Sequence, residues 1–254
     1  MSDQSLNKDR GARHLSLPQI GEKGQKLISN STVLIIGMGG LGCASASYLN
    51  SSGIKKIIIC DFDSVDATNL GRQILFGPSD IGKLKALAAK DHLEKINPEI
   101  DIQAITKKIN GQELITTDFE RSTIILDCSD NFNTRFEVNE YCVKNNHYLV
   151  SGSAIRFEGQ YAVFGNDYKT SSCYECLYDQ QDESFEDCQG NGVLGPIPGM
   201  IGAMMAIETI KIICNIDTQK GQLNIYEGLS NVALAYHNLS NIQCHLQTND
   251  IDNC

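Results

Sequence analysis

Four glycines directly after an apolar segment form the part of the chain best suited to receive a phosphate. Residues 33–36 are apolar, and the glycines that follow are Gly37, Gly39, Gly40 and Gly42. At such a junction one glycine makes the strand-to-helix turn, a second lets a phosphate approach the backbone, and a third lets the helix pack on the strand. The N–H groups and dipole at the helix start favour an anion. The pattern predicts a nucleotide site without choosing the nucleotide.

An acid follows the second apolar segment of the chain. Residues 56–60 lead into Asp61, roughly 20 residues beyond the glycines, where a carboxylate can accept hydrogen bonds from ribose hydroxyls. An oxidoreductase that uses a nicotinamide dinucleotide and an enzyme that uses ATP look alike up to this point. The acid therefore leaves both classes open.

Cationic and amide side chains in the loops after the second segment favour a triphosphate. They are Asn69, Arg72, Gln73 and Lys85. A dinucleotide carries only two bridging phosphates, which a helix N-terminus can largely satisfy. A triphosphate needs more cations, because charge develops on the departing pyrophosphate during transfer. The alternative is that Arg72 and Lys85 are solvated surface charges.

Acids also follow a third apolar segment, residues 122–127. It ends at Asp127, and Asp130 and Asn131 come just after it. Carboxylates that face phosphates suit Mg²⁺, which prefers oxygen ligands. Alternatively, Asp130 or Asn131 caps a helix that begins at Phe132. Both roles are compatible, and we expect Asp127 to be structural and Asp130 to be the metal ligand.

Alternating strand and helix patterns bring these groups to one edge of a sheet. Strand-like runs at 32–37, 56–61, 100–105, 122–127 and 148–152 alternate with helical patterns at 41–52, 83–96 and 132–145. The alternation predicts an α/β fold with a Rossmann-like, doubly wound and mostly parallel sheet. Further runs at 159–164, 221–226 and 231–237 are expected to extend the same sheet as antiparallel strands.

Three other segments have a predicted place in this fold. The helix at 83–96 is expected to bury one face, made of Leu84, Leu87, Ala88, Leu93 and Ile96. The apolar helix at 200–214 is expected to belong to the core or to a dimer interface. The polar, cysteine-rich crossover loop at 170–195 has a length typical of loops that are either functional or disordered.

Composition limits the class of protein. The chain has 254 residues, of which 41% are hydrophobic, which fits one α/β domain with small additions. Its net charge of −10 argues against nucleic-acid binding, which uses basic patches. No stretch reaches the roughly 18 apolar residues of a membrane span, and the first residues lack the apolar core of a secretory signal. We therefore expect a cytoplasmic protein that binds neither nucleic acid nor membrane.

The ten cysteines are expected to divide by function. Without a secretory signal they argue against a disulfide framework. Five lie in apolar segments and are expected to be small buried hydrophobes, namely Cys43, Cys60, Cys128, Cys142 and Cys214. Cys173 and Cys176 have the spacing of half a tetrahedral zinc site. A redox pair is the alternative, but the strand–helix context of thioredoxin-like motifs is absent.

Taken in order, these motifs resemble the ThiF/MoeB/HesA family of ubiquitin-activating-type adenylyltransferases. The resemblance runs from about Arg13 to about Cys244 and rests on residues 37–42, 61–63, 69–73, 85, 127–131, 151–153, 173–176 and 192–196. It implies MgATP-dependent adenylation of the C-terminal glycine carboxylate of a small ubiquitin-like sulfur-carrier protein ending in Gly-Gly. It also implies a separate sulfur-donor protein.

The resemblance assigns roles to individual residues. Asp61 would hold the ribose, and Asp130 would hold Mg²⁺. The phosphates would be held by Asn69, Arg72, Gln73 and Lys85. Arg13 matches an arginine that reaches into the nucleotide site of the neighbouring subunit, which implies a homodimer.

The resemblance also implies a division of the chain. Residues 1–254 would form a single adenylation domain, with an N-terminal helical arm at 1–30. The nucleotide-binding half would be 31–153 and the carrier-binding half 154–254.

The remaining cysteines are interpreted through the same resemblance. In the family a second Cys-x-x-Cys completes a zinc site. Here Cys244 matches its first member but Gln247 stands at the second, which leaves Cys254 or His245 as the fourth ligand, or a site that has decayed. Cys188 matches a loop cysteine that links covalently to the carrier in some members. Its acidic neighbours do not activate it, so it is either a nucleophile or an ordinary loop residue.

Three alternatives to the favoured function follow from the sequence. Residues 192–196 favour a ThiS-like carrier for thiamine thiazole biosynthesis, and a MoaD-like carrier for molybdopterin biosynthesis is the alternative. An NAD-dependent oxidoreductase would leave Arg72, Lys85 and Asp130 without a role. A silent scaffold that only binds a ubiquitin-like tail would not need the phosphate-binding cations.

Overall fold

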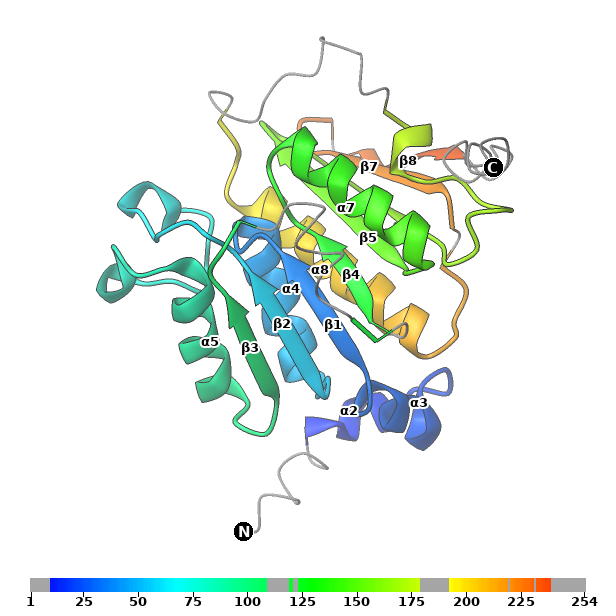
Figure 1. The fold of residues 1–254 in the computed structure, drawn as a ribbon, viewed down its shortest axis with the longest axis horizontal. Helices are drawn as coiled ribbons and strands as arrows, with labels where there is room; N and C mark the ends of the chain where they lie inside the picture. Colours follow the sequence, from blue (N-terminus) through cyan, green and yellow to red (C-terminus); the bar gives the residue numbers. More distant parts are fainter. Residues whose placement is uncertain are drawn as a thin grey trace, which may run out of the picture.

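One mixed sheet with helices on both faces organises the molecule. The structure is a computed structural model that describes residues 10–108, 119–120, 123–178, 192–218, 220–230 and 232–238. Within these residues the sheet has eight strands in the order β3-β2-β1-β4-β5-β6-β7-β8 (Figure 1). The predicted α/β fold, with a parallel sheet extended by antiparallel strands, is confirmed.

Five parallel strands form the first half of the sheet. They are β1 (Thr32–Ile36), β2 (Lys56–Cys60), β3 (Asp101–Ile105), β4 (Ile124–Asp127) and β5 (Leu149–Ile155). β1 lies between β2 and β4, in a register that pairs Ile36 with Cys60 on one side and with Asp127 on the other. Strand order reverses between β1 and β4, and a crevice at such a point is where open α/β sheets bind ligands.

Three antiparallel strands complete the sheet. They are β6 (Glu158–Phe164), β7 (Gln222–Glu227) and β8 (Val232–Asn238). β5 turns into β6 through a hairpin in which Ile155 pairs with Glu158. The predicted antiparallel extension is confirmed, and the hairpin carries residues 151–153 alongside the parallel half.

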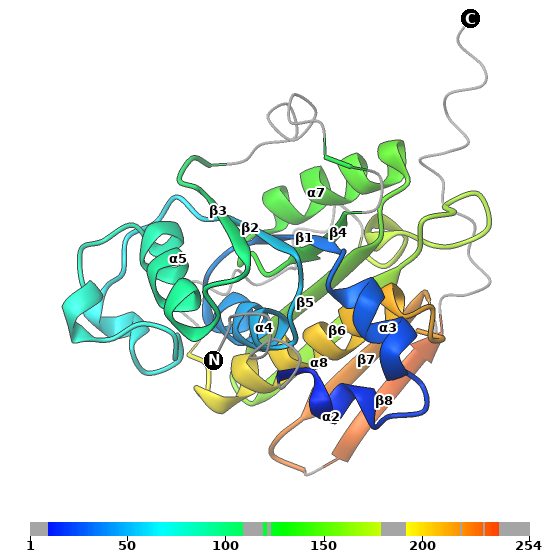
Figure 2. The same cartoon turned by 90° about the horizontal axis from the view of Figure 1, so that it is seen from below.

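Helices lie on both faces of the sheet (Figure 2), and the buried apolar residues form two hydrophobic cores. The first is built with α4 (Gly40–Ser51), α5 (Lys85–Ile96) and α8 (Pro196–Ile213), and the second with α7 (Phe132–Asn145) and the 3₁₀ helix η3 (Tyr174–Cys176). Along β1, Val33 and Ile35 belong to the first core, whereas Leu34 and Ile36 belong to the second. The alternation follows from the two-residue period of a strand, and burial on both faces explains the continuous apolar runs.

Short helices complete the described elements. α2 (Ala12–Leu15) and α3 (Gly21–Ile28) precede β1, so they lie toward the amino ends of the parallel strands. Two 3₁₀ helices, η1 (Ala67–Asn69) and η2 (Pro78–Asp80), lie in the long connection between β2 and α5. The connection between β2 and α5 therefore brings polar side chains to the carboxyl edge of the sheet.

α8 is by length and composition apolar enough to cross a membrane, and half of it is buried inside the molecule. It packs along α4, where the Ser45 hydroxyl donates a hydrogen bond to the Gly202 carbonyl at 2.8 Å. Ile201 and Met205 are fully buried in the first core. These contacts are those of a core helix, as the sequence predicted. Its outer side exposes Ile207, which is 56% accessible.

Two predictions about burial were wrong. On α5 the buried face consists of Lys85, Ala86, Ala88, Ala89 and Leu93, whereas Leu87 and Ile96 are exposed. Three of these five buried residues are alanines, whose small side chains let α5 approach its neighbours closely. Ala88 and Leu93 are buried as predicted, whereas Leu87 and Ile96 point outward. Cys214 is half-buried rather than buried, while Cys43, Cys60, Cys128 and Cys142 are buried as predicted.

Candidate active site

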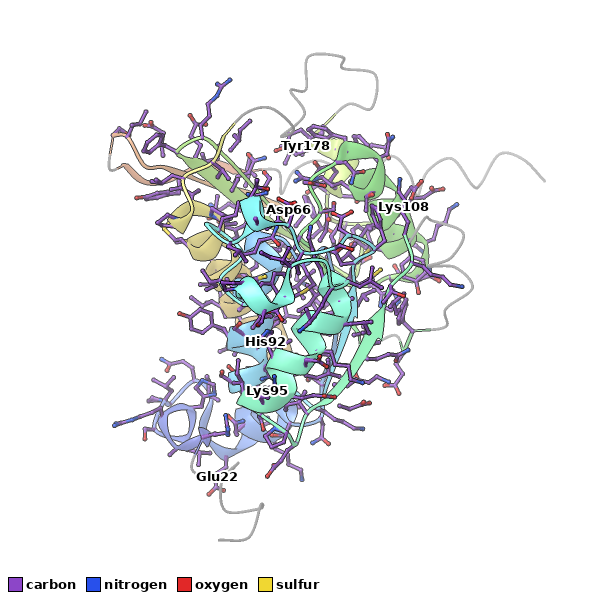
Figure 3. The ribbon with its side chains drawn as sticks, turned by 90° about the vertical axis from the view of Figure 1, so that its left-hand side faces the viewer. Glu22, Asp66, His92, Lys95, Lys108 and Tyr178 are labelled. Atoms are coloured by element: carbon purple, nitrogen blue, oxygen red, sulfur yellow. The ribbon has the colours of Figure 1, made fainter. Side chains whose placement is uncertain are left out.

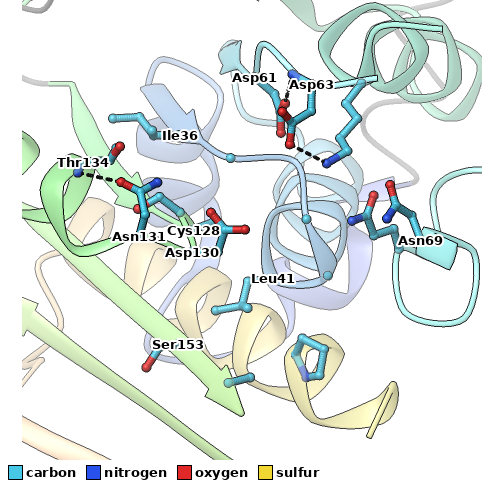
Figure 4. A pocket seen from close by; sticks show the side chains of 18 of the residues that line it. Ile36, Leu41, Asp61, Asp63, Asn69, Cys128, Asp130, Asn131, Thr134 and Ser153 are labelled. Carbon is cyan, nitrogen blue, oxygen red and sulfur yellow. Dashed lines mark hydrogen bonds and ion pairs between the residues drawn. The ribbon is translucent and has the colours of Figure 1, made fainter. Parts of the chain in front are cut away.

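A cavity of about 720 Å³ opens at the carboxyl ends of β1, β2 and β4 (Figure 4). Its volume is in the range typical of small-molecule sites. Most of the predicted nucleotide-binding residues line it, namely Gly37, Gly39, Gly40, Asp61, Asn69, Arg72, Gln73, Lys85, Asp130 and Asn131. The sheet edge therefore brings together three groups of residues that are separated along the chain.

The turn after β1 has room only for glycine at two positions. Gly37 has a φ of +90°, and a Cβ on it would lie 2.7 Å from the carbonyl oxygen of Cys128. A Cβ on Gly42 would lie 2.0 Å from the carbonyl oxygen of Gly37. Gly42 thus lets α4 pack against the turn. Unlike the other three glycines it does not line the cavity, which corrects its prediction as a ligand-binding residue.

Asp61 is fixed by two backbone N–H groups. Its Oδ2 accepts a hydrogen bond from Met38 at 2.7 Å, and its Oδ1 accepts one from Asp63 at 2.8 Å. Burial raises the pKa of Asp61, and the hydrogen bond from Met38 opposes that rise. Each carboxylate oxygen retains a second lone pair. The side chain can therefore still accept hydrogen bonds from the hydroxyls of a ligand.

Lys85 forms an ion pair with Asp63 in the cavity wall (Figure 4). The Lys85 Nζ lies 3.0 Å from Asp63 Oδ2, and the backbone N–H of Lys85 donates to the Asp63 carbonyl at 2.8 Å. The two contacts fix the start of α5 against the loop after β2. Asp63 was not predicted as a site residue, although its place two residues after Asp61 could have indicated it.

The η1 turn positions an arginine and two amides. Asp66 caps this turn, because its carboxylate accepts a hydrogen bond from the Thr68 N–H at 2.8 Å and its own N–H donates to Asn69 Oδ1 at 3.1 Å. The half-buried Arg72 donates to the Thr68 carbonyl at 3.1 Å. Gln73 is buried, and its Oε1 has no hydrogen-bond partner.

The segment after β4 contains one structural acid and one that faces the cavity. Asp127 is fully buried and accepts hydrogen bonds from the Ser129 N–H at 3.0 Å, the Ser129 hydroxyl at 2.6 Å and the Ser151 hydroxyl at 3.2 Å. Asn131 caps α7 through a hydrogen bond from a backbone N–H of the first turn. The structural role of Asp127 agrees with the expectation, and of the two candidates for the helix cap it is Asn131 that makes the hydrogen bond. Asp130 is exposed and lines the cavity.

Arg135 also lines the cavity, and the sequence analysis missed it. It is only 5% exposed and donates a hydrogen bond to the Ser129 carbonyl at 2.8 Å. Its guanidinium carbon lies 5.6 Å from the centre of the Phe132 ring. The signal that could have found it is an arginine in the first turn of a helix, where its charge opposes the helix dipole.

A narrow groove with a free volume of only about 10 Å³ adjoins the cavity and shares Arg135 and Ser153 with it. It runs along β5 and β6 and is also lined by Tyr174 and Tyr178, whose ring centres are 4.8 Å apart. Burial raises the pKa of both tyrosines. Their hydroxyls therefore stay protonated at neutral pH and place no negative charge in the groove.

Arg13 does not line the cavity. It is exposed on α2, which leads through α3 to the amino end of β1. Figure 3 shows Glu22, on α3, at one end of the molecule, and Lys108 of the cavity and Tyr178 of the groove toward the other. Arg13 therefore lies at the end of the chain's own fold that is opposite to the cavity.

Cys173 and Cys176 are spaced for a shared metal ion. Their Sγ atoms lie 3.7 Å apart. Tetrahedral zinc with Zn–S bonds of about 2.3 Å would hold two sulfurs about 3.8 Å apart. No group of three or more metal-binding side chains occurs among the residues that the structure describes. The other predicted ligands, Cys244 and Cys254, and the candidate nucleophile Cys188 lie outside those residues.

The fold and cavity define a class, the nucleotide-binding α/β proteins that hold their ligand at the carboxyl edge of an open sheet. Comparison with known proteins narrows this class to one family. The profile of the ThiF family matches residues 12–249, and the chain belongs to this family.

Curated relatives and solved structures agree with the family. Over 221 residues the chain is 37% identical to the sulfur carrier protein ThiS adenylyltransferase of Escherichia coli and covers 87% of each chain. It is 39% identical over 222 residues to adenylyltransferase and sulfurtransferase MOCS3 of Culex quinquefasciatus, covering 86% of this chain and 50% of that protein. The chain thus spans about half the length of such MOCS3 relatives. It is an adenylyltransferase, as the sequence predicted.

Among solved structures, E. coli MccB with ATP has a TM-score of 0.78 at 26% identity, over 92% of this chain and 70% of that one. PaaA, as its SeMet crystal structure, has a TM-score of 0.76 at 19% identity, over 94% of this chain and 84% of that one. The second likeness shows the fold alone.

Proposed function

We propose that the protein transfers the adenylyl group of ATP to the C-terminal glycine carboxylate of a small ubiquitin-like sulfur-carrier protein. The observation that carries this proposal is the convergence of Arg72, Lys85 and Asp130 on one cavity beside a glycine turn. The relative from E. coli, named for its action on ThiS, supports a sulfur carrier as the substrate. The MccB structure, which holds ATP, supports the nucleotide.

The cavity offers a suitable group for each part of ATP. Gly37, Gly39 and Gly40 line it at the start of α4, where backbone N–H groups favour phosphate oxygens. Asp61 is placed to accept hydrogen bonds from the ribose hydroxyls. Arg72 and Lys85 bring positive charge to the polyphosphate, and their position differs from the solvated surface charges that were the alternative.

The proposed reaction requires little proton transfer. A carboxylate oxygen of the terminal glycine attacks the α-phosphorus of ATP, a new P–O bond forms, and the bond to the departing pyrophosphate breaks. A terminal carboxylate is already ionised at neutral pH, so no general base is needed. Catalysis then rests on positioning and on stabilising charge, which are the roles proposed for Arg72 and Lys85.

The residues present also fit a magnesium ion. Asp130 is exposed to the cavity and offers the carboxylate oxygens that Mg²⁺ prefers. Bound Mg²⁺ would neutralise part of the phosphate charge. Asp127 is not available for this role, because three hydrogen bonds and complete burial commit it to the fold.

We propose a homodimer in which Arg13 serves the partner's site. The support is its exposure on α2, at the opposite end of the chain's own fold from the cavity. The exposed Ile207 on α8 and Tyr48 on α4 offer apolar surface of the kind found in subunit interfaces.

We propose a structural zinc ion at Cys173 and Cys176. The support is the 3.7 Å separation of their Sγ atoms, which suits two ligands of one tetrahedral ion better than two unrelated thiols. The ion would fix η3 and the loop beside it. Cys244, with Cys254 or His245, is proposed to supply the remaining ligands.

For the carrier we propose a ThiS-like protein of thiamine thiazole biosynthesis, with sulfur supplied by a separate donor protein. A MoaD-like carrier of molybdopterin biosynthesis is the second candidate, favoured by the 39% identity to MOCS3. In the ThiS-like case we propose Cys188 as the attachment point for the carrier.

Exchange of labelled pyrophosphate into ATP tests the function. Wild-type protein is expected to catalyse exchange only with a carrier, and to prefer a ThiS-like over a MoaD-like one. Arg72→Ala and Asp130→Ala are each expected to lower the rate by roughly 100-fold or more. Exchange that survives both substitutions contradicts the proposal. Thermal stabilisation by NAD but not by ATP would favour an oxidoreductase instead.

A further inference from the structure

Arg135 lies where the nucleotide cavity meets the adjoining groove, and it lines both. A carrier tail that enters the cavity must bring its terminal carboxylate to the α-phosphorus, and Arg135 lines this cavity from the side of α7. A buried cation therefore lies in the wall of the cavity that the nucleophile must enter.

The setting of Arg135 is electrostatically unusual. It is 5% exposed and sits in the first turn of α7, where the helix dipole is itself positive. Burial of a charge is unfavourable unless hydrogen bonds or opposite charges compensate it. The Ser129 carbonyl provides one such bond at 2.8 Å.

Arg135 is separate from the cations assigned to the phosphates. Arg72 and Lys85 come from the connection between β2 and α5, whereas Arg135 comes from α7. Figure 4 shows Asn131 and Thr134, at the start of α7, across the cavity from Asn69. The polyphosphate and the incoming carboxylate are therefore served from opposite sides.

We infer that Arg135 binds the terminal carboxylate of the carrier and positions it for attack, so that it selects a free acid at the end of the tail. This inference rests on the proposed function. A guanidinium can hold both oxygens of a carboxylate in a planar, bidentate contact. The protonated hydroxyls of Tyr174 and Tyr178 add no negative charge that would repel the tail.

The first test uses the wild-type protein without nucleotide. The probe is the carrier that supports pyrophosphate exchange, prepared once with its terminal carboxylate and once with a terminal carboxamide. We expect the acid to bind roughly 10- to 100-fold more tightly than the amide, as for hydrogen bonds to a charged partner. Equal affinity of the two forms would overturn the inference without any substitution.

The second test asks whether Arg135 is the source of this preference. In R135Q the acid-to-amide ratio, which is the affinity for the acid form of the carrier divided by that for the amide form, is expected to fall close to one. The affinity for the non-hydrolysable ATP analogue AMPCPP is expected to change little. In pyrophosphate exchange the KM for the carrier should rise far more than the KM for ATP. R135K keeps the charge but loses the planar fork, so it should retain part of the ratio.

Two further variants serve as controls. Lys144→Gln removes a cation from the exposed end of the same helix, where it pairs with Glu140, and should leave the ratio unchanged. Arg72→Gln removes a cation of the cavity and should weaken AMPCPP binding while the ratio persists. A ratio that stays at its wild-type value in R135Q, or disappears equally in Arg72→Gln, would refute the role of Arg135.

Failure of this inference is distinguishable from failure of the proposed function. Absence of exchange in the wild-type protein with every carrier would remove the function and the inference together. Normal exchange with unchanged discrimination in R135Q would remove only the inference. Circular dichroism checks that R135Q is folded. If R135Q does not fold, the relative affinities of R135K and of the wild-type protein for the acid and amide forms of the carrier decide whether Arg135 binds the carboxylate.

Discussion

The Nζ of Lys85 lies 3.0 Å from Asp63 Oδ2, so a carboxylate of the same cavity wall holds one of the cations proposed for the polyphosphate. The Lys85 side chain is 9% exposed and the Asp63 side chain 51% exposed. The pair therefore fixes a buried ammonium group from its solvent side. It also means that a nucleotide shares Lys85 with a protein carboxylate.

Asp63→Asn is expected to slow adenylation by roughly 10-fold, because the neutral amide orients Lys85 less firmly at the reacting phosphate. Lys85→Ala should cost more, roughly 100-fold or above, because it removes the charge itself. Rates of pyrophosphate exchange at saturating substrates measure both. In Lys85→Ala the further change of Asp63 to Asn should have almost no effect, and an additive loss would show that Asp63 acts on something else.

Gly42→Ala is expected to destabilise the fold by about 1–3 kcal/mol, since the new Cβ would lie 2.0 Å from the Gly37 carbonyl oxygen. Gly199→Ala, on α8, is the matched control, because a Cβ there meets nothing within 4 Å and alanine favours a helix. Urea denaturation of both variants gives the free energies of unfolding. Equal stability of the two variants would contradict the packing argument.

Asp80 should make the stability of the fold depend on acidic pH. Hydrogen bonds from the Gly77 N–H at 2.9 Å, His92 Nε2 at 2.7 Å and Lys83 Nζ at 3.0 Å hold its pKa well below its usual range. A carboxyl group with a lowered folded pKa stabilises the protein above its unfolded pKa, and this stability is lost as pH falls through the folded value.

Asp80→Asn is therefore expected to lose about 1–3 kcal/mol at pH 7, with the deficit shrinking below the ordinary aspartate pKa of about 4. Denaturation of both proteins between pH 3 and 7 measures the difference. Asp101→Asn serves as the control, because Asp101 is exposed and pairs with Lys56 at 3.5 Å. A deficit of the same size at both ends of this range would contradict the argument.

Mixing two inactive variants tests whether Arg13 acts on the partner's site. In a heterodimer of Arg13→Ala with Arg72→Ala, one site has its own Arg72 and the partner's intact Arg13, and the other site lacks both. Random reassociation makes about half of the dimers mixed, so about one quarter of wild-type activity should return. If Arg13 acted within its own chain, the mixture would stay inactive.

Loss of the metal should loosen the loop around η3. Cys173→Ser is expected to lower bound zinc, measured by elemental analysis, and to lower the melting temperature by several degrees. Cys142→Ser is the control, because that buried thiol lies on α7 and should leave the zinc content unchanged. Equal zinc in wild-type and Cys173→Ser protein would contradict the proposed site.

The order of strands and helices in the first half of the fold could be predicted because each element carries its own pattern. The apolar runs at β1, β2 and β4 reveal strands buried on both faces, and the polar residues that end them mark the edge where a ligand binds. Asp127 was correctly expected to be structural, and the sequence placed the helix cap at Asp130 or Asn131, of which Asn131 is the cap. Such local chemistry depends on neighbours that are close along the chain.

Burial on α5 could not be predicted from periodicity alone. Leu87 looked like a core residue, yet it is exposed, and the buried face consists of three alanines together with Lys85 and the predicted Leu93. Arg135 and Asp63 were missed for a related reason. Each matters through a partner from another element, the groove in one case and the start of α5 in the other.

The sequence by itself determined the family, the glycine turn and the residues suited to hold a nucleotide, since these depend on residue types at fixed local spacing. Only the tertiary structure decided that Gly42 lets α4 pack against the turn rather than lining the cavity, and that Asp63 holds Lys85. It also decided that Arg135 lines both the cavity and the groove. The reason is physical: contacts between elements depend on how strands and helices approach one another, and no local pattern records that distance.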